Sequence, residues 1–359
     1  LQSHLAQLEE NGTASNCTLI FFDVDRFKLI NDSYGHEAGD TVLKQIAIRT
    51  RTTLRAEDMV ARLGGDEFAL FLPGRKAAEG AEIGEGIIAA LGRPIQLAQA
   101  EVRLGASVGV AAYPDHGTDE KSLLKAADMA MYASKAHGKG CTTVFLPALL
   151  SHQMERAKLG QELKVAIEQG QLHPYFQPQI STHDFSLAGV EALVRWHHPT
   201  RGVLGPCEFL PVAAEMGLSA QIDRAVLHKA VTDIVDLRTK GVFIPKLSVN
   251  VSPARLENAE IVGDIEICGE LPFDLSFELL ETMFLDDLDQ NKADVIQQLI
   301  KRGVRIEMDD FGTGHASIAA LRKLRPSTLK IDRGLISDIS SADGQSLGLI
   351  KAIVQIGKT

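Results

Sequence analysis

The sequence predicts an α/β protein with two domains, and three observations lead to this prediction. The chain has 359 residues, which is enough for two domains. In the first half, one apolar segment ends in acidic residues and two others flank a pair of glycines, a pattern typical of a β-sheet. In the second half, strand-length apolar segments alternate with helical patterns, which is typical of a parallel barrel.

The composition excludes some classes of function. A net charge of −10 at pH 7 gives no basic surface, so we expect no nucleic-acid partner. The sequence contains no run of about 18 apolar residues, the length that would predict a membrane-spanning helix. No signal peptide is visible. The four cysteines lack metal-type spacing and are predicted to be free thiols in a reducing compartment: Cys17, Cys141, Cys207 and Cys268. We therefore expect a cytoplasmic location, with any membrane or sensor attachment outside this sequence.

Both ends of the sequence suggest a piece of a longer protein. The chain begins at Leu1 rather than methionine, and it stops at Thr359 just after a helical pattern. Residues 1–10 are predicted to be helical, and residues 148–160 are predicted to be a helical connector between the domains, because they contain little Gly, Pro or Ser.

A predicted hairpin opens the argument about function. Residues 59–63 and 68–72 are apolar runs of strand length, and Gly64-Gly65 lies between them. Two consecutive glycines permit the positive φ angles of a tight turn. Asp66 and Glu67 follow, although a turn followed by acids is most often only a solvated turn.

A second acidic segment strengthens the case for a site. The predicted strand 18–24 is apolar and leads into Asp23 and Asp25. If this strand lies beside the hairpin, Asp23 can meet Asp66 and Glu67. Three carboxylates repel one another unless a cation neutralises them, and their hard oxygen atoms suit Mg²⁺ with a phosphate substrate.

The remaining elements of the first half follow from periodicity and from glycine positions. Gly35 is predicted to end a short helix, and Gly39-Asp40 to begin another. The simpler interpretation of Asp40 is that it caps this helix together with nearby polar side chains. We also predict a helix over 76–92, a strand over 102–112 and a helix over 126–135 that Gly138 ends.

The second half predicts most of a barrel. The strand candidates are 172–180, 187–195, 246–251, 275–280, 303–309 and 327–332. The helix candidates are 207–216, 220–239, 291–302, 315–324 and 345–357. A parallel barrel needs eight strands and about 250 residues. We therefore expect the barrel to be incomplete at the C-terminal end of this sequence.

Polar residues stand at the ends of these strands, where a barrel places catalysis. Each one alone could be a surface acid or a helix cap. Five separate segments that each end an apolar strand make coincidence a poor explanation. The residues are Glu191, Asn250, Glu278, Glu281, Asp309, Asp310 and Lys330.

Two motifs carry a resemblance to known families that covers nearly the whole chain. Gly64-Gly65-Asp66-Glu67-Phe68 resembles the signature of the GGDEF family, the diguanylate cyclases. Glu191-Ala192-Leu193 resembles that of the EAL family, the cyclic-di-GMP phosphodiesterases. The resemblance implies a GGDEF domain over 1–147, with a central, mostly antiparallel sheet flanked by helices. It implies an EAL domain with a (β/α)8-type barrel over 161–359.

The GGDEF resemblance implies a role for each matching residue. It implies that Asp23, the Val24 carbonyl, Asp66 and Glu67 bind metal, with Glu67 also helping to deprotonate the attacking hydroxyl. Asn31 and Asp40 would read the guanine edge, which suits their donor and acceptor groups. The lysines near the phosphates would be Lys28, Lys135 and Lys139, although Lys139 could simply complement a helix C-terminus.

A further match concerns regulation. Arg55-Ala56-Glu57-Asp58 resembles the inhibitory site of the GGDEF family, where the product binds and arrests the enzyme. Arginine suits bidentate contact with phosphate. The simpler interpretation of Arg55 and Asp58 is a solvated charge cluster.

The EAL resemblance implies a two-metal site. Glu191, Asn250, Glu278 and Asp309 would bind a first metal, and Asp309 with Asp310 a second. Lys330 would orient or activate the water, and Glu281 would support the loop that holds the two aspartates. The family's substrate contacts match Gln177, Leu193 and Arg195.

The sequence departs from both families at several positions. Gly140 stands where GGDEF domains usually carry asparagine, and the family's opening D-x-L-T-x-L-x-N-R stretch would precede Leu1. A later EAL glutamate that binds metal would fall after Thr359. The other departures in the EAL half are Ala214, Leu280, His315 and Ala316.

Together these observations predict a bifunctional enzyme of cyclic-di-GMP turnover that requires Mg²⁺ or Mn²⁺ in both domains. The first domain would condense two GTP molecules, and the second would hydrolyse cyclic-di-GMP to pGpG. Because one GGDEF domain holds one GTP, cyclase activity implies a homodimer. Two alternatives stay open: a receptor for cyclic-di-GMP, and one active domain regulated by GTP or cyclic-di-GMP bound to the other.

Overall fold

The computed structural model describes residues 16–97, 100–257, 259–284, 290–312, 321, 324–337 and 345–358. The chain forms two compact units, Leu1–Glu155 and Arg156–Thr359. Helix α6 (Pro147–Glu168) runs through the segment predicted as a connector. The domain limits at residues 147 and 161 stay a prediction. No helix within the described ranges is long and apolar enough to cross a membrane.

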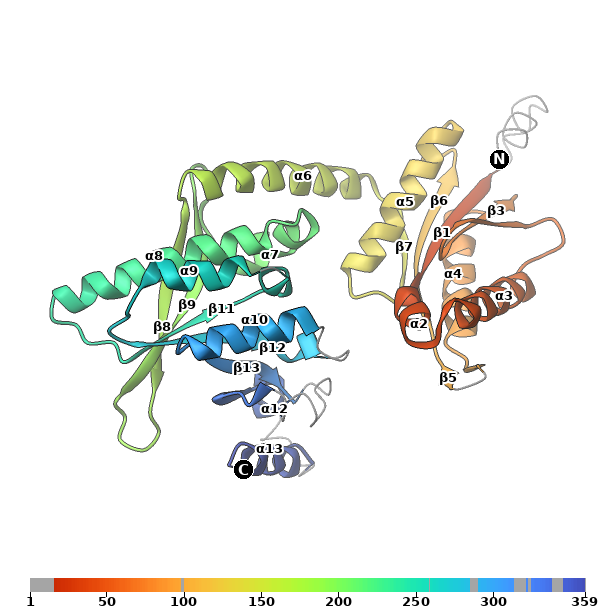
Figure 1. Ribbon diagram of the computed structural model, residues 1–359. Helices are drawn as coiled ribbons and strands as arrows, with labels where there is room; N and C mark the ends of the chain where they lie inside the picture. Colours follow the sequence, from red (N-terminus) through yellow and green to blue (C-terminus); the bar gives the residue numbers. More distant parts are fainter. Residues whose placement is uncertain are drawn as a thin grey trace. The chain divides into compact units, whose positions relative to one another are not determined.

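The first unit is built on a five-stranded sheet whose central strand is β1 (Figure 1). The strands β2, β3, β1 and β6 pair antiparallel in that order, and β7 pairs parallel to β6. The prediction of a mostly antiparallel sheet is therefore confirmed. The strands are β1 (Cys17–Asp25), β2 (Met59–Gly64), β3 (Glu67–Pro73), β6 (Gly105–Tyr113) and β7 (Thr142–Val144).

Strand β1 is apolar on both faces because helices cover both sides of the sheet. Ile20 and Phe22 pack in one cluster with residues of α3 and α4, whereas Leu19 packs in another with residues of α5. This burial explains why 19–22 is a continuous apolar run rather than an alternating one. The helices are α2 (Phe27–Tyr34), α3 (His36–Thr52), α4 (Ala77–Leu91) and α5 (Glu120–Ala136), and a small ribbon joins β4 (Ile95–Gln96) to β5 (Glu101–Val102).

Three local predictions for the first unit were wrong in detail. The hairpin turn is Gly65-Asp66 rather than Gly64-Gly65, because only Gly65 takes a positive φ and Gly64 stays in β2. Helix α3 begins at His36, directly after Gly35, which has a φ of 83°. The predicted strand 102–112 is divided between β5 and β6, and the short strand β7 was not predicted. The predicted helix 1–10 lies outside the described residues.

The second unit contains a mixed sheet in which β9 and β11 to β14 form the parallel part, whereas β8 and β10 pair antiparallel with β9. Strands β9, β11, β12, β13 and β14 are neighbours in that order and run parallel. The strands are β8 (Leu172–Ile180), β9 (Leu187–His198), β10 (Gly202–Leu204), β11 (Lys246–Asn250), β12 (Asp274–Leu280), β13 (Arg305–Phe311) and β14 (Thr328–Ile331).

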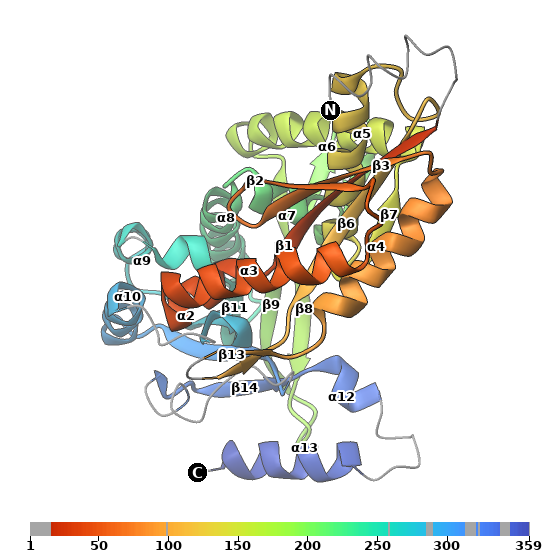
Figure 2. The same cartoon turned by 90° about the vertical axis from the view of Figure 1, so that its right-hand side faces the viewer.

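The prediction that strand 172–180 lies parallel in a barrel was wrong. Strand β8 pairs antiparallel with β9, and the two form a long ribbon (Figure 1 and Figure 2). The physical reason is the connection 181–186, which is far shorter than the dozen or so residues that a parallel crossover needs. A closed barrel stays a prediction, and most of the predicted helix 315–324 lies outside the described residues.

Helices pack on the apolar face of this sheet around Trp196, Phe209 and Phe277, which are fully buried. Strand β10 and helices α9 and α12 were not predicted. The helices after α6 are α7 (Pro206–Glu215), α8 (Ser219–Thr239), α9 (Glu260–Cys268), α10 (Gln290–Lys301), α12 (Arg333–Ser337) and α13 (Gln345–Ile356). Two 3-10 turns, η1 (Pro253–Leu256) and η2 (Glu281–Phe284), follow strands β11 and β12.

The close approach of α5 to β6 at Gly109 yields a stability prediction. A Cβ atom at Gly109 would lie 2.1 Å from the Met131 backbone nitrogen and 2.2 Å from the Ala127 carbonyl oxygen. Gly109→Ala must push helix α5 away from β6, and we expect the free energy of unfolding to fall by about 1–3 kcal/mol. Gly86→Ala, in helix α4 with nothing within 4 Å, is the control and should stabilise by about 0.5–1 kcal/mol. Urea denaturation checks this, and equal midpoints for the two variants would contradict it.

Candidate functional site

The strand register brings the acids of the first unit together. Asp23 on β1 lies opposite Glu67 on β3, and Asp66 occupies the turn just before Glu67. The Lys135 ammonium, from helix α5, lies 2.9 Å from Asp23 Oδ2. Val24, whose carbonyl was predicted as a metal ligand, is buried. Residues from three separate segments thus form one charged cluster.

The electrostatics of this cluster agree with its geometry. The pKa of Asp66 is raised from its ordinary value, first by burial and then by the negative charge of Asp23. Lys135 acts in the opposite direction. The cluster therefore holds two mutually repelling carboxylates that a nearby cation stabilises.

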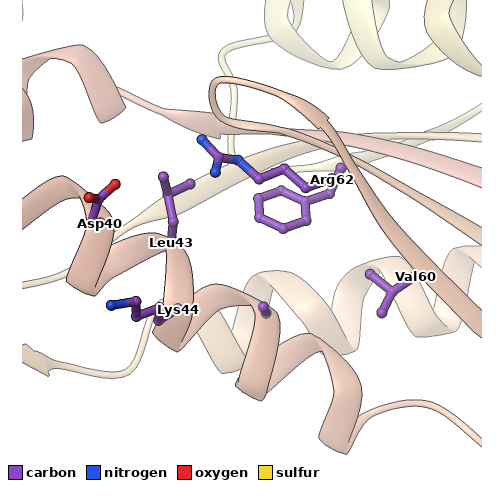
Figure 3. A pocket seen from close by; sticks show the side chains of 7 residues that line it. Asp40, Leu43, Lys44, Val60 and Arg62 are labelled. Carbon is purple, nitrogen blue, oxygen red and sulfur yellow. The ribbon is translucent and has the colours of Figure 1, made fainter.

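A pocket of about 420 Å³ lies between α3 and the hairpin (Figure 3). Asp40 lines it from the helix and Arg62 from strand β2. The predicted partner of Asp40, Asn31, packs against Gly39, where an added Cβ would lie 1.9 Å from Asn31 Oδ1. Gly39 therefore makes room for the Asn31 side chain beside Asp40. The remaining lining residues are Leu43, Lys44, Ala47, Val60 and Phe68.

Arg62 is a site residue that sequence reasoning missed. Its Nε donates a 2.8 Å hydrogen bond to the Gly65 carbonyl oxygen, so it closes the hairpin turn from within the pocket. The available signal was the strand alternation, which places Arg62 and Val60 on the same face of β2.

The structure explains one departure from the GGDEF pattern. Asp25 accepts hydrogen bonds from Ser107 Oγ at 2.8 Å and from the Gly140 amide at 3.1 Å. Gly140 has a φ of 60°, a conformation that glycine and asparagine both tolerate. Glycine can therefore replace the usual asparagine without strain. The neighbouring Lys139 is exposed, as is Lys28 on α2, and neither forms an ion pair within the described part of the chain.

The predicted inhibitory residues have different environments. The Asp58 side chain is fully buried and forms a 2.7 Å ion pair with Arg75. Asp58 Oδ2 also accepts a 2.8 Å bond from the Arg55 amide. The Arg55 side chain is exposed and lies 4.0 Å from Glu57. Asp58 is thus a buried structural group, not the solvated acid of the simpler interpretation.

In the second unit, Lys330 gathers three of the predicted acids. Its ammonium lies 2.6 Å from Glu278, 2.8 Å from Glu191 and 3.9 Å from Asp309. These residues come from four parallel strands of one sheet: β9, β12, β13 and β14. Asn250, at the end of β11, donates a 3.0 Å hydrogen bond to Glu191 Oε1.

Burial and mutual repulsion perturb this cluster strongly. Burial, together with the charges of Glu191 and Asp309, raises the pKa of Glu278 to about 8 against the opposing effect of Lys330. Burial alone would lower the pKa of Lys330, but the carboxylates of Glu278 and Glu191 outweigh it and raise that pKa. For Glu191 the effects are reversed: burial alone would raise its pKa, but the hydrogen bond and the charge of Lys330 outweigh burial and lower it. Perturbed groups of this kind are typical of functional sites.

The end of β13 is held by Glu281, whose Oε2 accepts a 2.8 Å bond from the amide of Gly312, the residue after the strand. Asp310 has a φ of 53°, an uncommon conformation for a residue other than glycine. Its pKa is raised by burial and by Asp309 and Asp332. Asp332 was not predicted as a site residue, although it follows Lys330 by two positions. His315 and Ala316 lie outside the described residues.

The predicted substrate residues share one face of the β8–β9 ribbon. Gln177 lies opposite Glu191, and Leu193 lies opposite Tyr175. The Arg195 guanidinium stands over the Tyr175 ring at 5.7 Å from its centroid. Tyr175 was missed, and its side chain orients Arg195 through this cation–π contact.

The donor set of the second unit fits a hard divalent cation. Within the described residues, no three histidine, cysteine or acidic side chains are arranged to hold one metal ion. However, the Lys330 ammonium already lies within 3.9 Å of Glu191, Glu278 and Asp309, and carboxylate and amide oxygens are the ligands that Mg²⁺ prefers. Glu191, Asn250, Glu278 and Asp309 are therefore the residues that would hold a metal.

Comparisons with known proteins assign both units. The family model "Diguanylate cyclase, GGDEF domain" matches residues 1–141, and the model "EAL domain" matches residues 160–359. The bifunctional diguanylate cyclase/cyclic di-GMP phosphodiesterase MucR of Pseudomonas aeruginosa is 36% identical over 95% of this chain. The cyclic di-GMP phosphodiesterase PdeR of Escherichia coli is 32% identical over 95%. The chain covers 50% and 51% of these relatives, about half of their length.

Solved structures agree with this assignment. The GGDEF–EAL part of Vibrio cholerae LapD, bound to c-di-GMP, aligns with 98% of this chain and 84% of its own, with a TM-score of 0.63. Its identity of 17% makes this a likeness of fold alone. The PaMucR phosphodiesterase in complex with c-di-GMP covers 56% of this chain and 82% of its own at 33% identity, with a TM-score of 0.51. The chain belongs to the EAL family and carries a GGDEF domain before it, so it is a tandem GGDEF–EAL protein.

Proposed function

We propose that this protein both makes and hydrolyses cyclic-di-GMP. The observation that carries the proposal is that each domain gathers its predicted acids around a lysine, Asp23 with Lys135 and Glu191, Glu278 and Asp309 with Lys330. A binding protein without catalysis would have no need for such concentrations of repelling charge beside a phosphate ligand.

In the first domain, two GTP molecules are condensed. The 3′-hydroxyl of each GTP attacks the α-phosphate of the other, which forms two phosphodiester bonds and releases two pyrophosphates. Asn31 and Asp40 bind guanine at the α3 pocket, and Lys28, Lys135 and Lys139 neutralise the phosphates. Glu67 accepts the proton of the attacking hydroxyl. Asp23, the Val24 carbonyl, Asp66 and Glu67 would hold Mg²⁺ or Mn²⁺, which would supply further neutralisation of charge.

The cyclase reaction requires two copies of the chain. One GGDEF domain holds one GTP, and the product has two-fold symmetry. Two domains must therefore meet face to face, and we propose a homodimer as the active form.

In the second domain, water opens cyclic-di-GMP to linear pGpG. Gln177, Leu193 and Arg195 hold the dinucleotide, and the Tyr175 ring orients the Arg195 guanidinium toward phosphate. Lys330 orients the attacking water, and the 3′-oxygen leaves with a proton. Glu281 keeps Asp309 and Asp310 in place through its bond to Gly312. Glu191, Asn250, Glu278 and Asp309 would hold one divalent cation, and Asp309 with Asp310 a second. The two cations would supply the activation of water.

Product analysis by chromatography tests this function. With Mg²⁺, we expect cyclic-di-GMP from GTP and pGpG from cyclic-di-GMP. Asp66→Ala should abolish only the first product and Glu191→Ala only the second, each by a factor of about 10² or more, because each variant removes a proposed metal ligand from one domain. A chelator should stop both reactions.

The outcomes separate the alternatives. A parent protein that binds cyclic-di-GMP and turns over neither substrate would be a receptor. A protein with one activity that depends on the nucleotide bound to the other domain would be a regulated, monofunctional enzyme.

We also propose that Arg55 and Asp58 bind product and inhibit the cyclase. The guanidinium of Arg55 is exposed beside Glu57 and can reach phosphate, whereas Asp58 contributes while it remains paired with Arg75. Arg55→Ala should relieve product inhibition of the cyclase and leave the stability of the protein unchanged.

The buried pair Asp58–Arg75 yields a separate stability prediction. Arg75→Met leaves the Asp58 charge buried without its partner and should cost about 3–5 kcal/mol. Arg55→Ala removes an exposed side chain and should change the free energy of unfolding by less than about 0.5 kcal/mol. Urea denaturation of both variants checks this. Similar midpoints would mean that the pair contributes nothing to the fold.

A further inference from the structure

Lys246 and Glu307 form an ion pair on the same face of the sheet as the acids around Lys330, nearer the start of strands β11 and β13. Lys246 precedes Asn250 by four residues on β11, and Glu307 precedes Asp309 by two residues on β13. Side chains two and four positions apart on a strand share a face. The pair therefore lies on the site face of the sheet, before the proposed metal ligands.

The two residues contact each other across the sheet. Lys246 Nζ lies 2.7 Å from Glu307 Oε1, and the Glu307 side chain is only 1% exposed. Ser248 Oγ donates a longer bond of 3.4 Å to Glu307 Oε2. Strand β12 lies between β11 and β13, so the lysine spans a neighbouring strand to reach its partner.

Strand β9 also contacts this lysine. Gly189, two residues before Glu191, has no side chain, and a Cβ there would lie 2.9 Å from both Cβ and Cε of Lys246. The aliphatic part of Lys246 therefore packs directly on the backbone of β9. Lys246 belongs to β11, which carries Asn250. Its side chain also contacts β9, which carries Glu191, and β13, which carries Asp309.

We propose that the Lys246–Glu307 ion pair fixes the spacing of β9, β11 and β13 and so positions Glu191, Asn250 and Asp309 for a divalent cation. This inference rests on the proposed phosphodiesterase function. Lys246 and Glu307 touch neither substrate nor cation in this proposal and act through the strands that they join.

Stability alone is a poor reason for such a pair. A buried ion pair loses much of its Coulomb energy to desolvation, and its replacement by apolar residues of similar size is often neutral or stabilising. A pair that supports metal ligands should instead affect metal affinity, because partners behind the ligands typically contribute 10–100-fold.

The test is Mn²⁺ binding to the full chain by titration calorimetry, where the binding step lost in Glu191→Gln is assigned to the second domain. In the double variant Lys246→Met with Glu307→Met, both replacements have similar length and the packing on Gly189 is kept. We expect a folded protein whose Mn²⁺ affinity at that step is at least tenfold weaker. The Mn²⁺ concentration for half-maximal cyclic-di-GMP hydrolysis should rise by the same factor.

A matched control exists in the same sheet, between β12 and β13. Arg305 and Asp274 form a 2.8 Å ion pair whose side chains are about half exposed. The double variant Arg305→Met with Asp274→Met should leave the Mn²⁺ affinity within twofold of the parent.

A third variant probes the packing and leaves both charges in place. Gly189→Ala must displace the aliphatic part of the Lys246 side chain, and we expect Mn²⁺ binding at least fivefold weaker than in the parent. If the double methionine variant does not fold, Gly189→Ala decides the question. The role of the pair would be overturned if the folded double methionine variant bound Mn²⁺ within twofold of the parent affinity. If that variant does not fold, the same result in Gly189→Ala would overturn it. A parent chain with no Mn²⁺ step lost in Glu191→Gln would instead refute the proposed function together with this inference.

Discussion

Repulsion between carboxylates is the constraint on which both sites depend. Acids that converge at the ends of strands raise one another's pKa, and burial adds to the effect, as Asp66 and Glu278 demonstrate. Each domain offsets this cost with one lysine near the end of its sequence, Lys135 on α5 and Lys330 on β14. In the proposed reactions, a divalent cation would take over this role from the lysine.

The two sheets solve the same problem of convergence in different ways. In the first domain, antiparallel pairing places Asp23 opposite Glu67, so two strands suffice. In the second, parallel strands place one polar residue each at a common edge, and several strands are needed. The parallel arrangement also leaves room for a layer behind the site, where Lys246 and Glu307 lie.

Sequence reasoning predicted the elements well where the pattern is local. The apolar run of β1 and the helical periods of α4 and α8 were confirmed to within a few residues. The exact turn of the hairpin was not, because the choice between Gly64 and Gly65 depends on the register of β2 against β3. The direction of β8 was also mispredicted: the short connection 181–186 is visible in the predicted strand bounds and forces an antiparallel pair, but the barrel pattern was given more weight.

The sequence by itself determined the α/β class, the tandem GGDEF–EAL organisation and the chemical types of the site residues, because motifs and periodicity are local properties of a chain. Only the tertiary structure decided which charges meet. Lys330 pairs with Glu191 across 139 positions, and Asp58 pairs with Arg75 rather than with solvent. Arg62, Tyr175 and Glu307 acquired meaning for the same reason. Their neighbours come from other strands, and the strength of a charge interaction depends on distance in space and on burial, which no spacing along the sequence encodes.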